Sequence, residues 1–404
     1  MFQHLQIPYR RERWLVGLAD SGLRAVEVIS APWRSRSTVA ALPKRILLFR
    51  LERVGDLVMV LDAIAMARSL APDARIDLVV GSWNAALARL IPTVDSVETL
   101  DVPWMAREQR ALAWPELIRH AKGWRERQYD LAINFEPDIR TNLLVALSGA
   151  PRRVGFVSGG GGAFLTDGLV PDPSAHVAHN AKALVARALG LPLVGDRPSS
   201  IVHRPSSDPG TGSLLKIPED ARRRAAELIG RLSPRGMTIG IQPAAGRQIK
   251  EWAPARFAEV GAELARRRGA KIVLIGSAAD QVALNLTRAA WPSDVPVMEI
   301  PVETDLIVLA AVLERLALFI TGDTGPMHLA AAVGTPVLAI FGPSLPTRYA
   351  PLSPGSRIIR IDIPCSPCNL MRRPPQRCVG HVPDCLAGIE SNQVLKAANE
   401  MLGA

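Results

Sequence analysis

The sequence predicts an α/β protein with two doubly wound parallel-sheet domains that face a cleft. Its 404 residues exceed one ordinary domain of about 150 residues. Short buried-strand patterns alternate with helical patterns, as is typical of parallel sheets covered by helices. The alternation stops near a Pro-, Ser- and Gly-rich stretch at 203–212 and then restarts. We therefore expect domains at 44–215 and 216–404, preceded by a separate segment at 1–43.

The segment at 1–43 is rich in arginine, and Trp14, Leu15 and Leu18 fall near helical spacing. Such a basic amphipathic helix could lie on an anionic membrane face, or it could pack on the domain or a partner. No apolar stretch reaches the roughly 18 residues that span a bilayer, and no signal-peptide core is present at the start. We therefore expect a cytoplasmic protein, with peripheral contact to the inner membrane face as an option.

The net charge of +10 comes mostly from arginine, which suits phosphate and carboxylate groups. The chain has no dense basic run interleaved with aromatic residues, so we expect no nucleic-acid partner. A phosphorylated substrate or an ordinary solvated surface explains the excess charge.

The first domain opens on an apolar run typical of a buried strand. We expect a flexible loop at the four glycines 159–162. The expected strands are 45–50, 76–80, 97–100 and 131–134, and the expected helices are 57–72, 115–127 and 141–147.

The second domain repeats the pattern, and ligands of such sheets bind beyond the carboxyl ends of the strands. The expected strands are 238–242, 271–276, 318–321 and 336–341, and the expected helices are 254–268, 306–315 and 326–333.

The turn with the sequence TGDTGP precedes a helix whose first position suits Pro326. Free N–H groups and the helix dipole favour a diphosphate there, beside Thr324 and Gly325. His328 could reach a phosphate or ribose. Asp323 would repel phosphate, so it could cap the helix or organise the loop instead. The alternative for the whole turn is a structural cap with a core-facing histidine.

Two further turns of this domain carry candidate donor-binding residues. Lys250 follows a strand and offers a mobile positive charge, although an ordinary surface turn is the alternative. Asp280 could accept hydrogen bonds from a ribose, or serve as a helix N-cap.

In the first domain, Asp56 lies at a strand-to-helix junction and could take a proton from an acceptor hydroxyl. A plain N-cap aspartate is the alternative, and Glu52 is the rival base. Glu136, Asp138 and Arg140 follow another strand and could hold a sugar acceptor.

Four cysteines lie in the segment 365–385, where a structural zinc site is one option. The first pair has zinc-like spacing but the second is loose, so we favour free thiols and expect no catalytic metal. The cysteines are Cys365, Cys368, Cys378 and Cys385.

Three segments carry a family resemblance: RILLFRLERVGDLVMVLDAI, IGIQPAAGRQIKEWAPARFAEV and FITGDTGPMHLAAAVGTPVLAIFGP. Together they resemble glycosyltransferase family nine, the bacterial heptosyltransferases of lipopolysaccharide core synthesis. The PCSPC stretch is similar to a common tail of that family, so the similarity covers roughly 44–390. The resemblance implies a GT-B fold and an inverting, metal-independent transfer from ADP-heptose.

The resemblance also implies individual roles. Asp56 matches the base, Lys250 matches a phosphate-binding lysine, and Asp280 falls near a ribose-contacting acid. The donor-binding turn matches Asp323, Thr324, Gly325 and His328.

The sequence thus predicts a glycosyltransferase that uses a nucleotide-diphosphate sugar and a lipid-linked or oligosaccharide acceptor, with no cofactor required. A transferase that uses a UDP-hexose, a nucleotide-sugar epimerase of similar fold and a membrane-associated scaffold are the alternatives. Acceptor identity stays open, because the N-terminal segment and the four-glycine loop depart from the family pattern.

Overall fold

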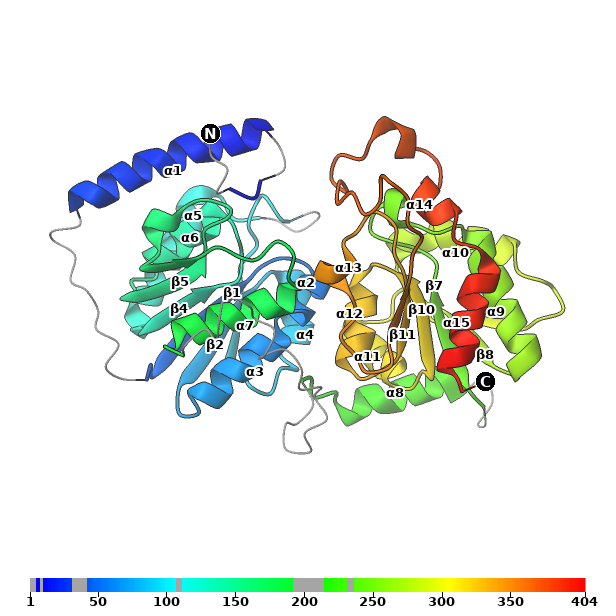
Figure 1. The fold of residues 1–404 in the computed structure, drawn as a ribbon. Coiled ribbons are helices and arrows are strands. Elements are labelled where there is room, and N and C mark those ends of the chain that lie inside the picture. The colour runs from blue at the N-terminus through cyan, green and yellow to red at the C-terminus, as the bar shows by residue number, and fades with distance from the viewer. Residues whose placement is uncertain are drawn as a thin grey trace. The chain divides into compact units, whose positions relative to one another are not determined.

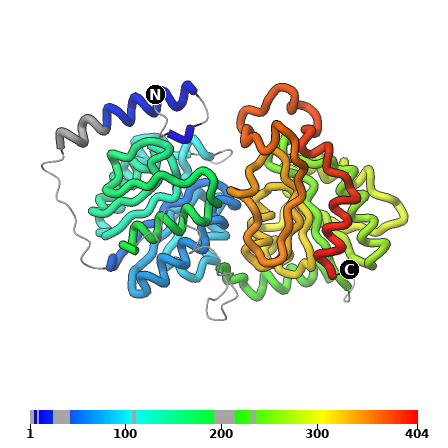
Figure 2. Tube along the Cα trace, in the orientation of Figure 1, coloured from blue at the N-terminus to red at the C-terminus, as the bar shows by residue number. Residues whose placement is uncertain are grey.

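The computed structural model describes residues 5–7, 10–30, 42–106, 111–191, 214–230 and 236–403. The chain forms two compact units, Met1–Arg204 and Pro205–Ala404 (Figures 1 and 2). The expected linker at 203–212 lies outside the described residues. The domain boundary expected at 215 stays a prediction.

The first unit is built on a six-stranded parallel sheet with the order β3-β2-β1-β4-β5-β6. The chain runs from β1 outward to β3 and then crosses back to β4, so the strand order reverses between β1 and β4. The strands are β1 (Arg45–Arg50), β2 (Arg75–Val80), β3 (Ser96–Thr99), β4 (Leu131–Asn134), β5 (Arg152–Phe156) and β6 (Asp167–Leu169).

Helices cover both faces of this sheet, which explains why β1 is apolar along nearly its whole length. Leu47 and Phe49 pack on one face against Leu117 of α5 and Leu144 of α6, and Phe49 meets the Trp124 ring edge-on at 5.0 Å. The helices are α1 (Arg10–Ser30), α2 (Val54–Val58), α3 (Leu61–Leu70), α4 (Ala85–Ala88), α5 (Trp114–Gly123), α6 (Ile139–Leu147) and α7 (Val177–Ala188).

The second unit repeats the topology, with the sheet order β12-β11-β10-β7-β8-β9. Its strands are β7 (Thr238–Gln242), β8 (Lys271–Leu274), β9 (Val297–Glu299), β10 (Leu318–Gly322), β11 (Val337–Ile340) and β12 (Arg357–Ile359). Its helices are α8 (Glu219–Gly230), α9 (Pro254–Arg268), α10 (Gln281–Ala289), α11 (Leu306–Glu314), α12 (Gly325–Ala332), α13 (Pro346–Tyr349), α14 (Asp384–Ala387) and α15 (Ser391–Met401).

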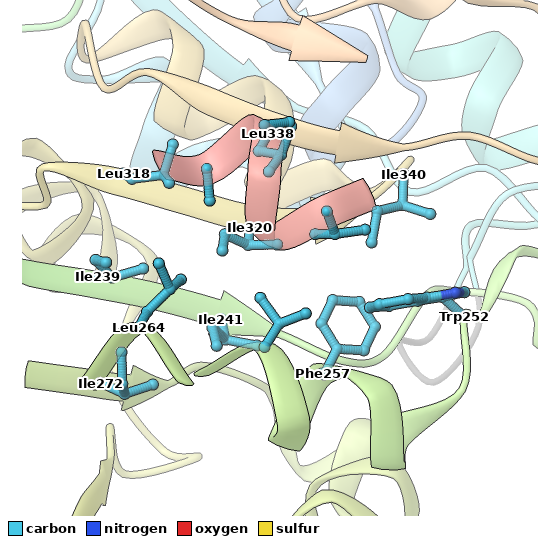
Figure 3. Packing of buried hydrophobic residues seen from close by; sticks show 14 of the residues in the cluster. Ile239, Ile241, Trp252, Phe257, Leu264, Ile272, Leu318, Ile320, Leu338 and Ile340 are labelled. Carbon is cyan, nitrogen blue, oxygen red and sulfur yellow. The ribbon is translucent and has the colours of Figure 1, made fainter. Parts of the chain in front are cut away.

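Aliphatic side chains of four neighbouring strands form the core of this unit under α9 and α15 (Figure 3). Trp252 closes one end of the core, where its ring meets Phe257 edge-on at 4.9 Å. The Trp252 indole N–H donates to the carbonyl of Ile389 at 3.0 Å, so its polar atom is satisfied inside the core. This packing fixes the strand ends from which the candidate site extends.

The expected strands and most of the expected helices are present, with ends that differ by a few residues. The helix expected at 57–72 is wrong as a single element, because Val60 leaves the helical conformation (φ −104°, ψ 1°) and separates α2 from α3. The chain enters α2 three residues earlier than expected, at Val54. Asp56 therefore lies inside the first turn of a helix.

The four-glycine run contacts α1, the long helix of the N-terminal segment (Figure 1). Gly161 N donates to Asp20 Oδ1 at 2.8 Å, and a Cβ on Gly160 would lie only 2.5 Å from Val16 Cγ1. Gly160 and Gly161 have φ values of 84° and 75°, which favour glycine. The sequence predicted a flexible loop here, but the structure shows buried glycines packed against a helix.

Candidate active site

Arg50 is the centre of a buried charged cluster at the carboxyl end of β1. Its side chain is 4% exposed and lies 3.3 Å from Asp56, 3.4 Å from Glu52 and 3.4 Å from Glu136. Its guanidinium also donates to the carbonyls of Phe135 at 2.8 Å and Asp56 at 3.0 Å. One cation thus faces three carboxylates. Sequence reasoning did not select Arg50, although a charged residue that ends an apolar strand was the available signal.

Asp56 combines a partly open position with an unusual proton affinity. Burial, helped by the negative charge of Glu52, raises the pKa of Asp56 from 3.8 to about 6, against the opposing effect of Arg50. The side chain keeps 29% exposure, so a ligand can reach it. Asp56 is the third residue of α2 and accepts from Arg53 N at 3.3 Å, so it is not the N-cap residue.

Glu136 is a buried carboxylate that holds the loop after β1. Its Oε1 accepts from the backbone N–H groups of Leu51 at 2.7 Å and Glu52 at 3.0 Å. Burial raises the pKa of Glu136 despite the nearby Arg50 charge. A side chain that is 1% exposed cannot bind an acceptor directly. Its contacts instead fix the loop that carries Glu52 and Asp56.

Asp138 and Arg140 bind each other rather than the Arg50 cluster. Asp138 caps α6 by accepting from Arg140 N at 2.7 Å, and its carboxylate holds the Arg140 guanidinium through contacts of 2.9 and 2.5 Å. The guanidinium also lies 4.4 Å from the ring centre of Trp104, which stacks on Trp114. Arg140 is thus a fixed, partly exposed cation four residues after Glu136.

In the second unit, Lys250 and Asp323 form an ion pair beyond the carboxyl ends of β7 and β10. Lys250 Nζ lies 3.0 Å from Asp323 Oδ2 and donates to the Asp323 carbonyl at 2.5 Å. Ser344 Oγ donates to the same carboxylate at 2.5 Å. Burial alone would raise the pKa of Asp323, but Lys250, His328 and Ser344 together hold it below its ordinary value. Asp323 therefore stays ionised and positions Lys250.

Thr324, and not Asp323, is the N-cap of α12. Its Oγ1 accepts from Met327 N at 3.2 Å and lies 3.0 Å from Gln242 Oε1, to which it donates. The hydroxyl is therefore used within the fold rather than offered as a donor to a ligand. Gly325 begins the helix without a side chain, so a ligand can approach the backbone there. Gln242 and Ser344 were not predicted as site residues from the sequence.

His328 lies in the first two turns of α12 and is buried. Burial lowers its pKa from 6.5 to about 4, and Lys250 adds to the effect while Asp323 opposes it. The imidazole is therefore neutral near pH 7 and can either donate or accept a hydrogen bond.

Asp280 accepts from Ser277 through both the backbone N–H and the hydroxyl, each at 2.8 Å. Its carboxylate is thus part of a local capping box, and no side-chain cap bond to α10 is formed. Glu251, which sequence reasoning missed, lies nearby and accepts from Ala245 N at 3.2 Å. Burial, with a smaller effect of Asp280, raises the pKa of Glu251.

The four cysteines line one cavity of about 230 Å³ in the second unit. Burial, helped by the neighbouring Cys368 and Cys365, raises the pKa of Cys385 to about 11, so this thiol stays protonated. Among the described residues, no three His, Cys, Asp or Glu side chains are grouped so that they could hold a metal ion.

Both charged clusters lie where the strand order of a sheet reverses, between β1 and β4 in one unit and between β7 and β10 in the other. Ligands of doubly wound sheets bind at this position. A solved family 9 glycosyltransferase from Veillonella parvula matches 90% of this chain and 99% of its own with a TM-score of 0.74 at 24% identity. The E. coli ADP-heptose lps heptosyltransferase II matches 89% and 98% with a TM-score of 0.69, also at 24% identity. The fold is that of a GT-B glycosyltransferase with two Rossmann-like units.

The family model described as glycosyltransferase family 9 (heptosyltransferase) matches residues 117–377. A curated relative, lipopolysaccharide heptosyltransferase 2 of Escherichia coli K12, is 27% identical over 316 residues, which cover 76% of this chain and 85% of the relative. The chain belongs to glycosyltransferase family 9. The resemblance seen in the sequence is thereby confirmed.

Proposed function

We propose that the protein transfers a heptose from ADP-heptose to a lipopolysaccharide-core-type acceptor, with inversion at the anomeric carbon. The observation that carries the proposal is a partly exposed Asp56 whose pKa of about 6 suits a general base. Family membership supplies the reaction class, and the solved relative named for ADP-heptose supports the donor.

In this mechanism, Asp56 accepts the proton of an acceptor hydroxyl while the hydroxyl oxygen attacks the anomeric carbon. The bond between that carbon and the phosphate oxygen breaks, and ADP leaves with the electron pair. At pH 7 most Asp56 is ionised and able to accept a proton. Glu52, the rival base, has the supporting role of raising the proton affinity of Asp56.

The donor's diphosphate would bind at the start of α12, beside Lys250 and Gly325. Two of the three N–H bonds of Lys250 point to Asp323, which leaves one for a phosphate oxygen. The charge that develops on the leaving ADP would meet this fixed cation and the helix N-terminus. These groups supply charge stabilisation without a metal ion. His328 would bind phosphate or ribose as a neutral partner, and Asp280 the ribose.

Arg140 would contact the acceptor, with Asp138 holding its guanidinium and Glu136 shaping the loop beneath. A fixed arginine favours phosphate or carboxylate groups on the acceptor. We further propose that the acceptor is lipid-linked, so that the protein works in contact with the inner membrane face. No described helix has the length and apolar character to cross a bilayer.

The test is transfer itself, with ADP-heptose and UDP-hexoses offered in turn together with the acceptor and with EDTA present. We expect ADP release and a product of inverted anomeric configuration only when ADP-heptose and acceptor are both present. Thermal shifts should be larger with ADP than with UDP, because a preferred ligand stabilises by mass action. Conversion of a nucleotide sugar without acceptor would indicate an epimerase instead, and loss of transfer in EDTA would contradict metal independence.

A further inference from the structure

The described part of α1 exposes large apolar side chains and buries a carboxylate. Trp14, Leu15 and Leu18 are 50%, 69% and 50% exposed, whereas Asp20 is 2% exposed and Gly17 is buried. A surface helix of a globular protein normally buries its apolar stripe and exposes its polar residues. The described part of α1 departs from this pattern, because its large apolar residues are exposed together with Arg10 and Arg11 while Asp20 is buried.

The contacts that hold α1 on the first unit explain why these apolar residues are exposed. Asp20 accepts from the backbone of Gly161, and Val16 fills the space that Gly160 leaves by lacking a Cβ. Gln6, which precedes the helix, donates its backbone N–H to Ser158 O at 2.9 Å. The contacts that hold the helix thus come from its other residues, and Trp14, Leu15 and Leu18 are exposed.

Basic residues flank this surface. Arg10 and Arg11 are exposed in the first turn, and the whole chain carries a net charge of +10. Arginine pairs well with lipid phosphates, and tryptophan prefers the interface between headgroups and acyl chains.

We propose that the α1 face formed by Arg10, Arg11, Trp14, Leu15 and Leu18 binds the surface of an anionic phospholipid membrane. The apolar residues enter the headgroup boundary and the arginines contact lipid phosphates, as in interfacial helices. In this proposal α1 is the membrane-binding element. The four-glycine loop, residues 159–162, is the seat of α1, meaning the part of the first unit that α1 contacts.

This inference rests on the proposed function for its biological meaning. The seat lies at the carboxyl edge of the first sheet, because the glycine run follows β5 and packs on the loop after β4. A Cβ on Gly159 would lie 1.8 Å from the carbonyl of Pro137, the residue after Glu136. The same edge carries Asp56. A membrane bound to α1 would therefore present a lipid-linked acceptor to this edge of the first unit.

The experiment compares the full-length parent with a variant that combines Trp14→Ser, Leu15→Ser and Leu18→Ser. Binding is measured by co-sedimentation with vesicles of phosphatidylcholine alone or mixed with phosphatidylglycerol. The matched control combines Val282→Ser and Leu286→Ser on α10, which are 72% and 55% exposed. We expect the parent and the control to bind anionic vesicles and the α1 variant to bind about tenfold or more weakly. Arg10→Gln with Arg11→Gln should weaken binding and reduce its salt dependence.

Equal vesicle binding by parent and α1 variant would overturn the proposal, as would absence of binding by the parent. A parent that dimerises, does not bind vesicles and becomes monomeric in the α1 variant would assign the face to a second copy instead. Transfer to a water-soluble acceptor should be the same in all variants, which shows that they are folded. If the parent binds vesicles through α1 but transfers no sugar, the proposed function fails while this inference stands.

Discussion

In each unit, a cation at or after the first strand in chain order forms an ion pair with a carboxylate that follows the fourth strand. In the first unit the pair is Arg50 with Glu136, and two further carboxylates, Glu52 and Asp56, approach the same guanidinium. In the second unit Lys250 meets Asp323, whose carboxylate also accepts from Ser344. The topology is shared, but the charge balance is not.

This difference in charge suits the two clusters to different chemistry. Burial, together with the negative charge of Glu52, raises the pKa of Asp56 to about 6. The ion pair with Asp323 holds the Lys250 ammonium group in a fixed position, which suits a diphosphate. The first cluster is therefore suited to moving a proton, and the second to holding an anion.

The largest effect expected is on turnover after Asp56→Asn, which leaves the shape of the first cluster but removes its base. We expect kcat to fall by about 10²–10⁴-fold, while ADP affinity changes by less than about twofold. Transfer kinetics and calorimetric ADP binding measure the two effects. Asp73→Asn, at an exposed position, is the control. Turnover within about tenfold of the parent would exclude Asp56 as the base.

The second cluster is tested by Lys250→Met, which we expect to weaken ADP binding by about 10–100-fold because one charge-assisted contact is lost. The variant also leaves Asp323 buried without its cation, so it should unfold at a lower temperature. Calorimetry and thermal melting measure both effects.

Lys250→Met combined with Asp323→Asn separates these causes. The double variant should recover much of the lost melting temperature but not the ADP affinity. Recovery of both would mean that Lys250 acts only by stabilising the loop.

A smaller effect concerns stability. The folded chain holds the Asp56 proton more tightly than the unfolded chain, so ionising Asp56 costs folding free energy as pH rises from about 4 to about 6. Below this range Asp56→Asn should match the parent. Above it the variant should be more stable by about 1–2 kcal/mol, a value reduced for the partial exposure of the side chain. Urea unfolding of the parent and of Asp56→Asn at pH 4 and pH 7 measures the difference. Equal free energies of unfolding for the two proteins at both pH values would contradict the raised pKa.

The smallest effect concerns Glu52, whose charge contributes to the raised pKa of Asp56. The pH profile of kcat/KM should rise to a plateau through an inflection near 6. Glu52→Gln should move the inflection to lower pH and increase the rate at pH 6 by less than about threefold. Glu126→Gln, at an exposed position, should leave the profile unchanged. An inflection that moves upward would show that Glu52 does not act through its charge.

Patterns that depend on one segment of chain were readable from the sequence. Apolar runs bounded by turns located the central strands β1, β4, β7 and β10, and the strand-to-helix junctions after them located Asp56 and Asp323. The rule that ligands bind beyond the carboxyl ends of strands then predicted the sheet edges at which the two charged clusters lie.

Contacts between distant segments were not readable. Nothing local shows that Arg50 meets Glu136, or that Ser344 donates to Asp323. The glycine run suggested flexibility because its function depends on Val16 and Asp20, more than a hundred residues away. The direction in which α1 displays its apolar residues likewise follows from that contact and not from its periodicity.

In the described part of the chain, each sheet consists of six strands that are consecutive in the sequence, and no strand is exchanged between the two units. During synthesis, β6 leaves the ribosome well before β7, so the first sheet can close while the second is still being translated. The contacts of Arg50 with its carboxylates can then form before the second unit folds. We expect folding to proceed vectorially, and substitutions that impair the second core to leave nascent chains with a native-like first half.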